Sequence, residues 1–317
     1  MVRHMKKITS LTALLLFVQV TMASGIGGFA GAALRITPDP LAAGTGGITL
    51  FQQSSTNSYA HNPAALAFSS ERSFDAGTVQ LSLDRYIYTA VASVPLPPTA
   101  RLSFGLVAAG TKDIMARDSR GFEAGLMDDS ELAYLVSFSN QFSDKLAVGV
   151  SLRLLTRNLV SEVEWLDLDA SGFGAGVGVL YKANENGTLA IAVKDWNASY
   201  KWKTQDLFDQ GSSYQEQFPM SLAWGWMQDM DQFTIALEHN YYFAGESIYR
   251  LGVLWQAVAG ISVQAGSSYE DGEVHPGLSL RLERSLIRGL PMHIDLGMVD
   301  GVRGEPLRLY MGWGLTF

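Results

Sequence analysis

Residues 306–317, PLRLYMGWGLTF, alternate two kinds of side chain. Large apolar residues stand at every second position, namely Leu307, Leu309, Met311, Trp313, Leu315 and Phe317. Small or polar residues fill most of the positions between them, namely Arg308, Tyr310, Gly312, Gly314 and Thr316. Because alternate residues of a β-strand point to opposite faces, the stretch predicts a strand with one large apolar face.

The same alternation recurs along the chain, for example in residues 146–154, 173–181, 233–243, 278–283 and 292–298. We expect about fourteen strands, each of about the 9 to 11 residues that a tilted membrane strand needs. Their predicted centres lie near residues 79, 90, 105, 134, 150, 176, 192, 222, 237, 251, 265, 279, 295 and 312.

The predicted connectors alternate in length. Residues 95–100, 140–144, 182–187 and 228–231 form short turns, whereas residues 112–128, 158–169 and 199–217 form long loops. An even number of strands, with short turns at one rim and long loops at the other, is typical of outer-membrane barrels. The pattern therefore predicts an all-β fold, a transmembrane antiparallel β-barrel over residues 71–317.

The second face of these strands separates a barrel from a soluble β-sandwich. A sandwich packs one face into a dry core, where an unpaired charge costs several kcal/mol. Here that face is rich in glycine, alanine and serine and carries charges on many strands. We expect these charges to line a polar lumen: Arg153, Arg250, Arg281, Glu283, Asp295 and Arg308. The barrel is favoured because its apolar face then meets lipid.

The first residues indicate export. Basic residues near Arg3 and Lys7 precede an apolar stretch of about ten residues and a small-residue end, which predicts a signal peptide over residues 1–23. Together with the barrel, this predicts the outer membrane of a Gram-negative-type bacterium, with membrane lipid, lipopolysaccharide and the barrel-assembly machinery as partners. The net charge of −8 argues against nucleic acid as a partner. The chain has no cysteine, the histidines show no ligand spacing, and we expect no metal or cofactor.

Residues 24–70 precede the first confident strand and predict a hatch, or plug, inside the lumen. A barrel of about fourteen strands leaves a lumen unless something fills it. Pro63 fixes its own φ and keeps Asn62 extended, so the Asn62 amide is placed to bond the barrel wall, next to Ala64. The alternative is that Asn62 and Pro63 form an ordinary turn.

Residues 41–68, LAAGTGGITLFQQSSTNSYAHNPAALAF, resemble the N-terminal signature of the PorV/PorQ family, a branch of the FadL-like fourteen-stranded barrels. The matching positions of its Asn-Pro-Ala-Gly-Leu-Ala motif are Asn62, Pro63, Ala64, Leu66 and Ala67, with Ala65 in place of glycine. Residues 170–196 are similar to a central hairpin of these proteins, and the final Phe317 resembles the end that the assembly machinery recognises. The resemblance implies a barrel with a hatch.

The sequence points to roles other than catalysis and leaves three open. A FadL-like transporter passes hydrophobic, fatty-acid-like molecules, and we expect its outer loops to capture them through Phe122, Trp165, Trp202 and Phe208. A PorV-like accessory of type IX secretion receives secreted cargo proteins instead. A structural surface barrel does neither. The sequence does not separate the first two; the transporter is the primary hypothesis, and the secretion accessory is the alternative.

Overall fold

A computed structural model describes residues 28–51, 61–162, 167–203, 214–287, 290–301 and 305–317. The expected signal peptide, Trp165 and Phe208 lie outside these ranges. The described strands are β1 (Ser73–Gln80), β2 (Arg85–Leu96), β3 (Ala100–Arg117), β4 (Glu123–Gln141), β5 (Leu146–Ser161), β6 (Leu168–Lys182), β7 (Gly187–Lys203), β8 (Tyr214–Gln217), β9 (Ser221–Met230), β10 (Phe233–Tyr242), β11 (Glu246–Val258), β12 (Ile261–Glu270), β13 (Glu273–Ile287), β14 (Leu290–Val299) and β15 (Arg308–Thr316).

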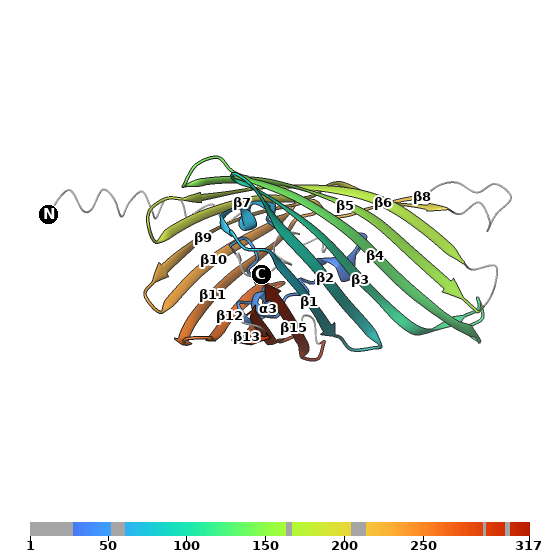
Figure 1. Ribbon diagram of the computed structural model, residues 1–317. Helices are drawn as coiled ribbons and strands as arrows, with labels where there is room; N and C mark the ends of the chain where they lie inside the picture. Colours follow the sequence, from blue (N-terminus) through green and yellow to red (C-terminus); the bar gives the residue numbers. More distant parts are fainter. Residues whose placement is uncertain (1–27, 52–60, 163–166, 204–213, 288–289, 302–304) are drawn as a thin grey trace, which may run out of the picture.

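These strands form one closed antiparallel barrel (Figure 1). Strand β1 pairs with β15, and β6 pairs with β7, which closes the sheet. Both β8 and β9 pair with β7 at successive positions, so they share one place and the barrel has fourteen positions for its fifteen described strands. The predicted all-β barrel of fourteen strands is confirmed, and every predicted centre lies in a strand.

The predicted strand lengths and long loops were wrong on one side of the barrel. Strands β3 and β4 run for 18 and 19 residues, and their pairing continues through most of residues 112–128. Register shifts after Thr111 and near Ala116 break the period of two there, and charged residues replace apolar ones. Backbone pairing does not need an apolar face, so the strands continue beyond the part that alternates.

The side-chain distribution is inverted relative to a soluble protein. On β5, Leu152 and Leu154 are 49% and 60% exposed on the outer surface, whereas Ser151 and Arg153 are buried inside. Similar exposed apolar residues surround the barrel on most strands. An apolar surface this extensive is typical of a barrel whose outer face meets lipid. Among the described residues, no helix is long and apolar enough to cross a bilayer.

The described residues before β1 lie inside the barrel, where Figure 1 draws them in blue. It contains the short helices α2 (Ala32–Arg35) and α3 (Pro40–Gly44) and the 3₁₀ helix η3 (Pro63–Phe68). Helix α3 contacts β12 to β15, and η3 contacts β3 to β6. We call the described residues 28–51 and 61–68 the plug. The plug thus contacts opposite walls of the barrel.

Two local caps explain the plug helices. The Asp39 carboxylate accepts hydrogen bonds from the amides of Leu41 and Ala42, at 2.8 and 3.3 Å, and Pro40 starts α3. The Asn62 side chain accepts from the amide of Ala64 at 3.0 Å and starts η3. Each cap satisfies amides that a helix N-terminus leaves unbonded.

Glycine residues of the barrel wall make room for the plug. A Cβ atom added at any of these inward positions overlaps plug atoms: Gly149, Gly178, Gly252, Gly266, Gly277 and Gly297. At Gly277 the obstacle is the carbonyl of Ala43, and at Gly178 it is the Asn62 side chain. The small residues of the inner face therefore serve close packing of the plug as well as a polar lumen.

Candidate functional site

A cavity of about 700 Å³ lies between the plug and the barrel wall. We call it the upper chamber, and we call the rim next to Phe317 the inner rim and the opposite one the outer rim. The chamber lies toward the outer rim, because its lining includes Leu81 and Asp300 from the ends of β1 and β14. Phe29, Arg35 and Ile36 of the plug also line the chamber. A cavity of this volume has room for a small molecule.

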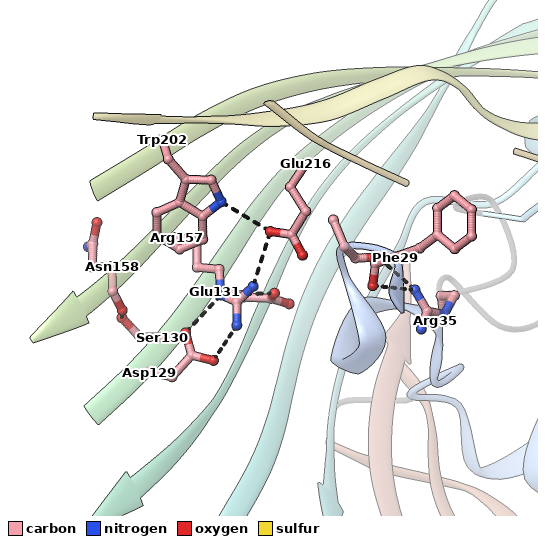
Figure 2. Close-up of polar contacts among 10 residues, drawn as sticks. Phe29, Arg35, Asp129, Ser130, Glu131, Arg157, Asn158, Trp202 and Glu216 are labelled. Atoms are coloured by element: carbon pink, nitrogen blue, oxygen red, sulfur yellow. Dashed lines mark hydrogen bonds and ion pairs between the residues drawn. The ribbon is translucent and has the colours of Figure 1, made fainter. Parts of the chain in front are cut away.

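A charged cluster forms one wall of the chamber (Figure 2). The guanidinium of Arg157 donates two hydrogen bonds to Asp129, at 2.9 and 2.7 Å, and lies 3.4 Å from Glu131 and 3.7 Å from Glu216. The Trp202 indole N–H donates to Glu216 at 3.0 Å, and its ring lies 5.4 Å from the Arg157 guanidinium. One cation therefore holds three carboxylates together.

Five residues that line the chamber also line a smaller cavity, the lower cavity, and we call these five residues the neck. These shared residues are Arg35, Thr37, Gly47, Tyr242 and Arg250. The lower cavity measures about 20 Å³, which is room for a group of about the size of one water molecule. Both cavities therefore lie beside the plug and adjoin each other at these five residues.

The neck is anchored by Glu238 on β10. One carboxylate oxygen accepts from the Arg250 side chain at 2.8 Å, and the other accepts from the amides of Thr49 and Leu50 at 2.9 and 3.1 Å. Glu238 is 4% exposed. A buried carboxylate of this kind is stable because a cation and two amides share its charge. The plug is thus bonded to the wall at the neck.

Burial and charge also act on the titratable plug residues. Burial, together with the positive charges of Lys194, Arg250 and Arg153, lowers the pKa of His61 well below its usual value. Its Nε2 atom lies 3.3 Å from the Thr37 hydroxyl. His61 is therefore neutral at neutral pH, and the cations around it dominate the local potential.

Most of the predicted lumen charges are paired. Arg153 pairs with Asp195, and Arg250 pairs with Glu238. The other pairs are Arg281 with Asp295 at 2.7 Å, and Arg308 with Glu305 at 2.8 Å. Glu283 is exposed near the inner rim. The upper chamber receives Arg250 and Arg308 of the predicted set, whereas Arg153, Arg281 and Asp295 pack inside the barrel.

Of the predicted capture residues, the structure describes Phe122 and Trp202, and these two have different partners. Phe122 stands 65% exposed at the turn between β3 and β4, where the Arg120 guanidinium lies 5.5 Å from its ring. Trp202 belongs to β7 and holds Glu216 beside the chamber. The Asn62 amide donates to the Leu50 carbonyl at 2.8 Å, a bond within the plug and not to the wall. Pro63 and Ala64 are buried against the wall at Gly149.

Glu238 was not predicted as a site residue, although its position in the sequence carries a signal. Strands 233–242 and 246–258 form a hairpin in which Glu238 and Arg250 are direct cross-strand partners. Arg281 and Asp295 are partners in the same way. Opposite charges at paired inward positions predict such ion pairs once the register is known.

Comparison with solved structures identifies the architecture. The Ralstonia pickettii toluene transporter TbuX superposes with a TM-score of 0.65 at 12% identity, over 90% of this chain and 100% of that chain. The Pseudomonas putida toluene transporter TodX gives 0.62 at 14%, over 87% and 96%. A Pseudomonas aeruginosa FadL homologue gives 0.63 at 10%, over 91% and 98%. The fold is that of a FadL-like barrel.

The similarity concerns the fold, since the sequences have diverged this far. No family model and no curated protein matches the chain. The FadL-like part of the predicted resemblance is therefore supported, while the PorV/PorQ branch stays a prediction.

Proposed function

We propose that this FadL-like barrel is a passive channel that admits small hydrophobic molecules through the outer membrane. The observation that carries the proposal is the upper chamber, which adjoins the neck beside a plug that is bonded to the wall. The similar solved structures include two toluene transporters, which supports the same class of activity. The apolar outer surface supports a place in the membrane.

The chamber is suited to a molecule with an apolar body. Phe29, Ile36, Leu81, Ile248 and Val299 line it between the charged groups. Apolar area removed from water there favours binding by about 25 cal/mol per Å². The route then continues at the neck, where Arg35 and Arg250 stand beside Gly47. Passage requires these neck side chains or the adjoining plug to shift.

The test is a deletion strain compared with its parent. Uptake of a labelled long-chain fatty acid and of labelled toluene is measured in the same cultures as the secreted and surface proteome. We expect uptake of at least one compound to fall while exported proteins stay unchanged. Exported proteins that accumulate in the periplasm with normal uptake would instead support the PorV-like secretion role. No change in either would support a structural barrel.

A further inference from the structure

Three carboxyl groups meet at the outer rim of the barrel. Glu246 is the first residue of β11, and Glu270 is the last residue of β12, next to Asp271 in the following turn. One carboxylate oxygen of each lies within 4.8 Å of the others. Glu246 is buried, and Glu270 lines the upper chamber. Like charges this close repel one another, so three ionised carboxylates there carry a high electrostatic cost.

Glu270 changes its charge close to neutral pH. Its carboxyl group is hydrogen-bonded with that of Glu246, which requires a proton on one of the two groups. Burial, and then the hydrogen bond and charge of Glu246, raise the pKa of Glu270 from the usual 4.5 to about 7. Glu270 stands one residue beyond the outward-facing Tyr269, outside the membrane-spanning part of β12. It is therefore protonated below about pH 7 and ionised above it.

The groups around Glu270 decide what its ionisation does. The charged and titratable ones are Tyr242 of β10, Glu246 and Arg250 of β11, Asp271 of the turn, Glu273 and His275 of β13, and Arg35 of the plug. The positive charge of Arg250 acts against the rise in the Glu270 pKa. Ionised Glu270 and Arg250 therefore attract each other.

The Arg250 side chain can reach Glu238 or Glu270. It donates to Glu238 at 2.8 Å through Nη1, while its Nε atom has no hydrogen-bond partner in the described part of the chain. Ser268 is the cross-strand partner of Arg250, and Glu270 lies two positions further along the same inner face. Such diagonal neighbours lie about 7 to 8 Å apart, within reach of long side chains. Arg250, Ser268 and Glu270 all line the upper chamber.

We propose that Glu270 is a pH-sensitive switch that competes with Glu238 for the Arg250 guanidinium. This regulation rests on, and deepens, the proposed channel function. While Glu270 is protonated, Arg250 stays on Glu238, which also accepts from two plug amides. When Glu270 is ionised, Arg250 turns toward it, and Glu238 keeps a buried charge without its cation. That arrangement is costly unless water reaches the Glu238 carboxylate, so the plug opens more readily at the neck.

The experiment measures hydrogen exchange at the Thr49 and Leu50 amides of the full mature chain in lipid nanodiscs. Exchange is compared at about pH 6 and about pH 8, on either side of the Glu270 pKa of about 7. A chelating buffer keeps divalent cations away from the three carboxylates, and each rate is divided by that of an unstructured peptide at the same pH. We expect protection to be at least about tenfold lower at the higher pH, the effect of losing one charge-assisted hydrogen bond.

Variants assign this pH dependence to Glu270. Glu270→Gln stays neutral and should show the same protection at both pH values. Glu273→Gln, at the exposed cross-strand partner of Glu270, should keep the pH dependence of the parent protein. Glu131→Gln, in the carboxylate cluster around Arg157, should keep it as well.

Two results would overturn the proposal. Equal protection of the parent protein at both pH values would show that no titrating group controls the plug at the neck. A fall in protection in Glu270→Gln as large as in the parent would assign the titration to another group. Exchange in the purified barrel involves no transported molecule, whereas uptake in the deletion strain involves no change of pH. Failure of the switch and failure of the channel function are therefore distinguishable.

Discussion

The carboxylate of Glu238 and the backbone amide of Leu50 are 3.1 Å apart, although 188 positions separate them in the chain. Glu238 belongs to the barrel wall and Leu50 to the plug. Both groups are buried, so water does not compete strongly for either. The bond therefore couples plug position to the charge state and geometry of the neck.

Replacing Glu238 should loosen the plug. Glu238→Gln removes the negative charge that Arg250 and the amides of Thr49 and Leu50 share. The Arg250 guanidinium then lacks its carboxylate partner. Loss of a charge-assisted bond costs about 1.5 to 3 kcal/mol, so local opening should rise roughly 10- to 150-fold. Hydrogen exchange at the amides of Thr49 and Leu50 measures it.

Glu283→Gln is the matched control, because Glu283 is exposed near the inner rim. Its exchange at Thr49 and Leu50 should equal that of the parent protein. Equal exchange in Glu238→Gln as well would show that the carboxylate does not hold the plug.

The wall glycines predict a second effect. In Gly277→Ala the new methyl group overlaps the Ala43 carbonyl of the plug, so the plug or β13 must move. Overpacking of this kind costs about 1 to 3 kcal/mol. The urea midpoint of unfolding should fall, whereas Gly28→Ala, with no atom near the new methyl, should leave it unchanged. A normal midpoint in Gly277→Ala would contradict close packing of the plug at this wall.

The barrel was predictable because one face of each membrane strand must be apolar. Alternation in residues 146–154 and 306–317 therefore marked strands β5 and β15 directly. The outer parts of β3 and β4 were not predictable in this way, because water satisfies either face beyond the membrane. Charges and register shifts there resemble loop sequence.

The site was less predictable than the fold, since it depends on register and on the plug. Arg250 was expected in the lumen, but its partner Glu238 follows only from the hairpin register. Lys194 and Asp195 were harder still, because a positive φ at Asp195 breaks the alternation on which the prediction rests. Phe122 and Trp202 were expected to act together, yet Phe122 lies at the β3–β4 turn and Trp202 on β7, and they have different partners.

Arg157 should stabilise the barrel wall beside the chamber through its ion pairs with three carboxylates. In Arg157→Met, Asp129, Glu131 and Glu216 lie together without the cation between them. We expect a loss of about 3 to 5 kcal/mol at neutral pH, the usual cost of removing one partner from a largely buried pair. Unfolding in urea at neutral pH measures it.

The exposed Arg117–Glu123 pair provides the control for Arg157. Arg117→Met should cost less than about 1 kcal/mol, as is usual for surface ion pairs. A loss in Arg157→Met no larger than this would contradict the role of the cluster.

Phe317 should matter for assembly more than for the stability of the finished barrel. Its backbone bonds to Arg72 close β15 onto the start of β1, while its ring is 57% exposed. A ring that packs little in the folded state contributes little to stability. We expect Phe317→Ser to lower the amount of folded, heat-modifiable barrel in outer membranes several-fold. Phe142→Ser, an equally exposed ring at the inner rim, should not lower it.

Asn62 tests whether the plug takes part in passage. Asn62→Ala removes the cap on the Ala64 amide and the bond to the Leu50 carbonyl, which should cost about 1 to 2 kcal/mol locally. Asn62→Asp keeps an acceptor for Ala64 and loses only the donor to Leu50, so it separates the two bonds. Both variants should raise hydrogen exchange in residues 61–68. If the plug gates the channel, uptake of labelled fatty acid or toluene should change with them, and unchanged uptake at a normal protein level would count against gating.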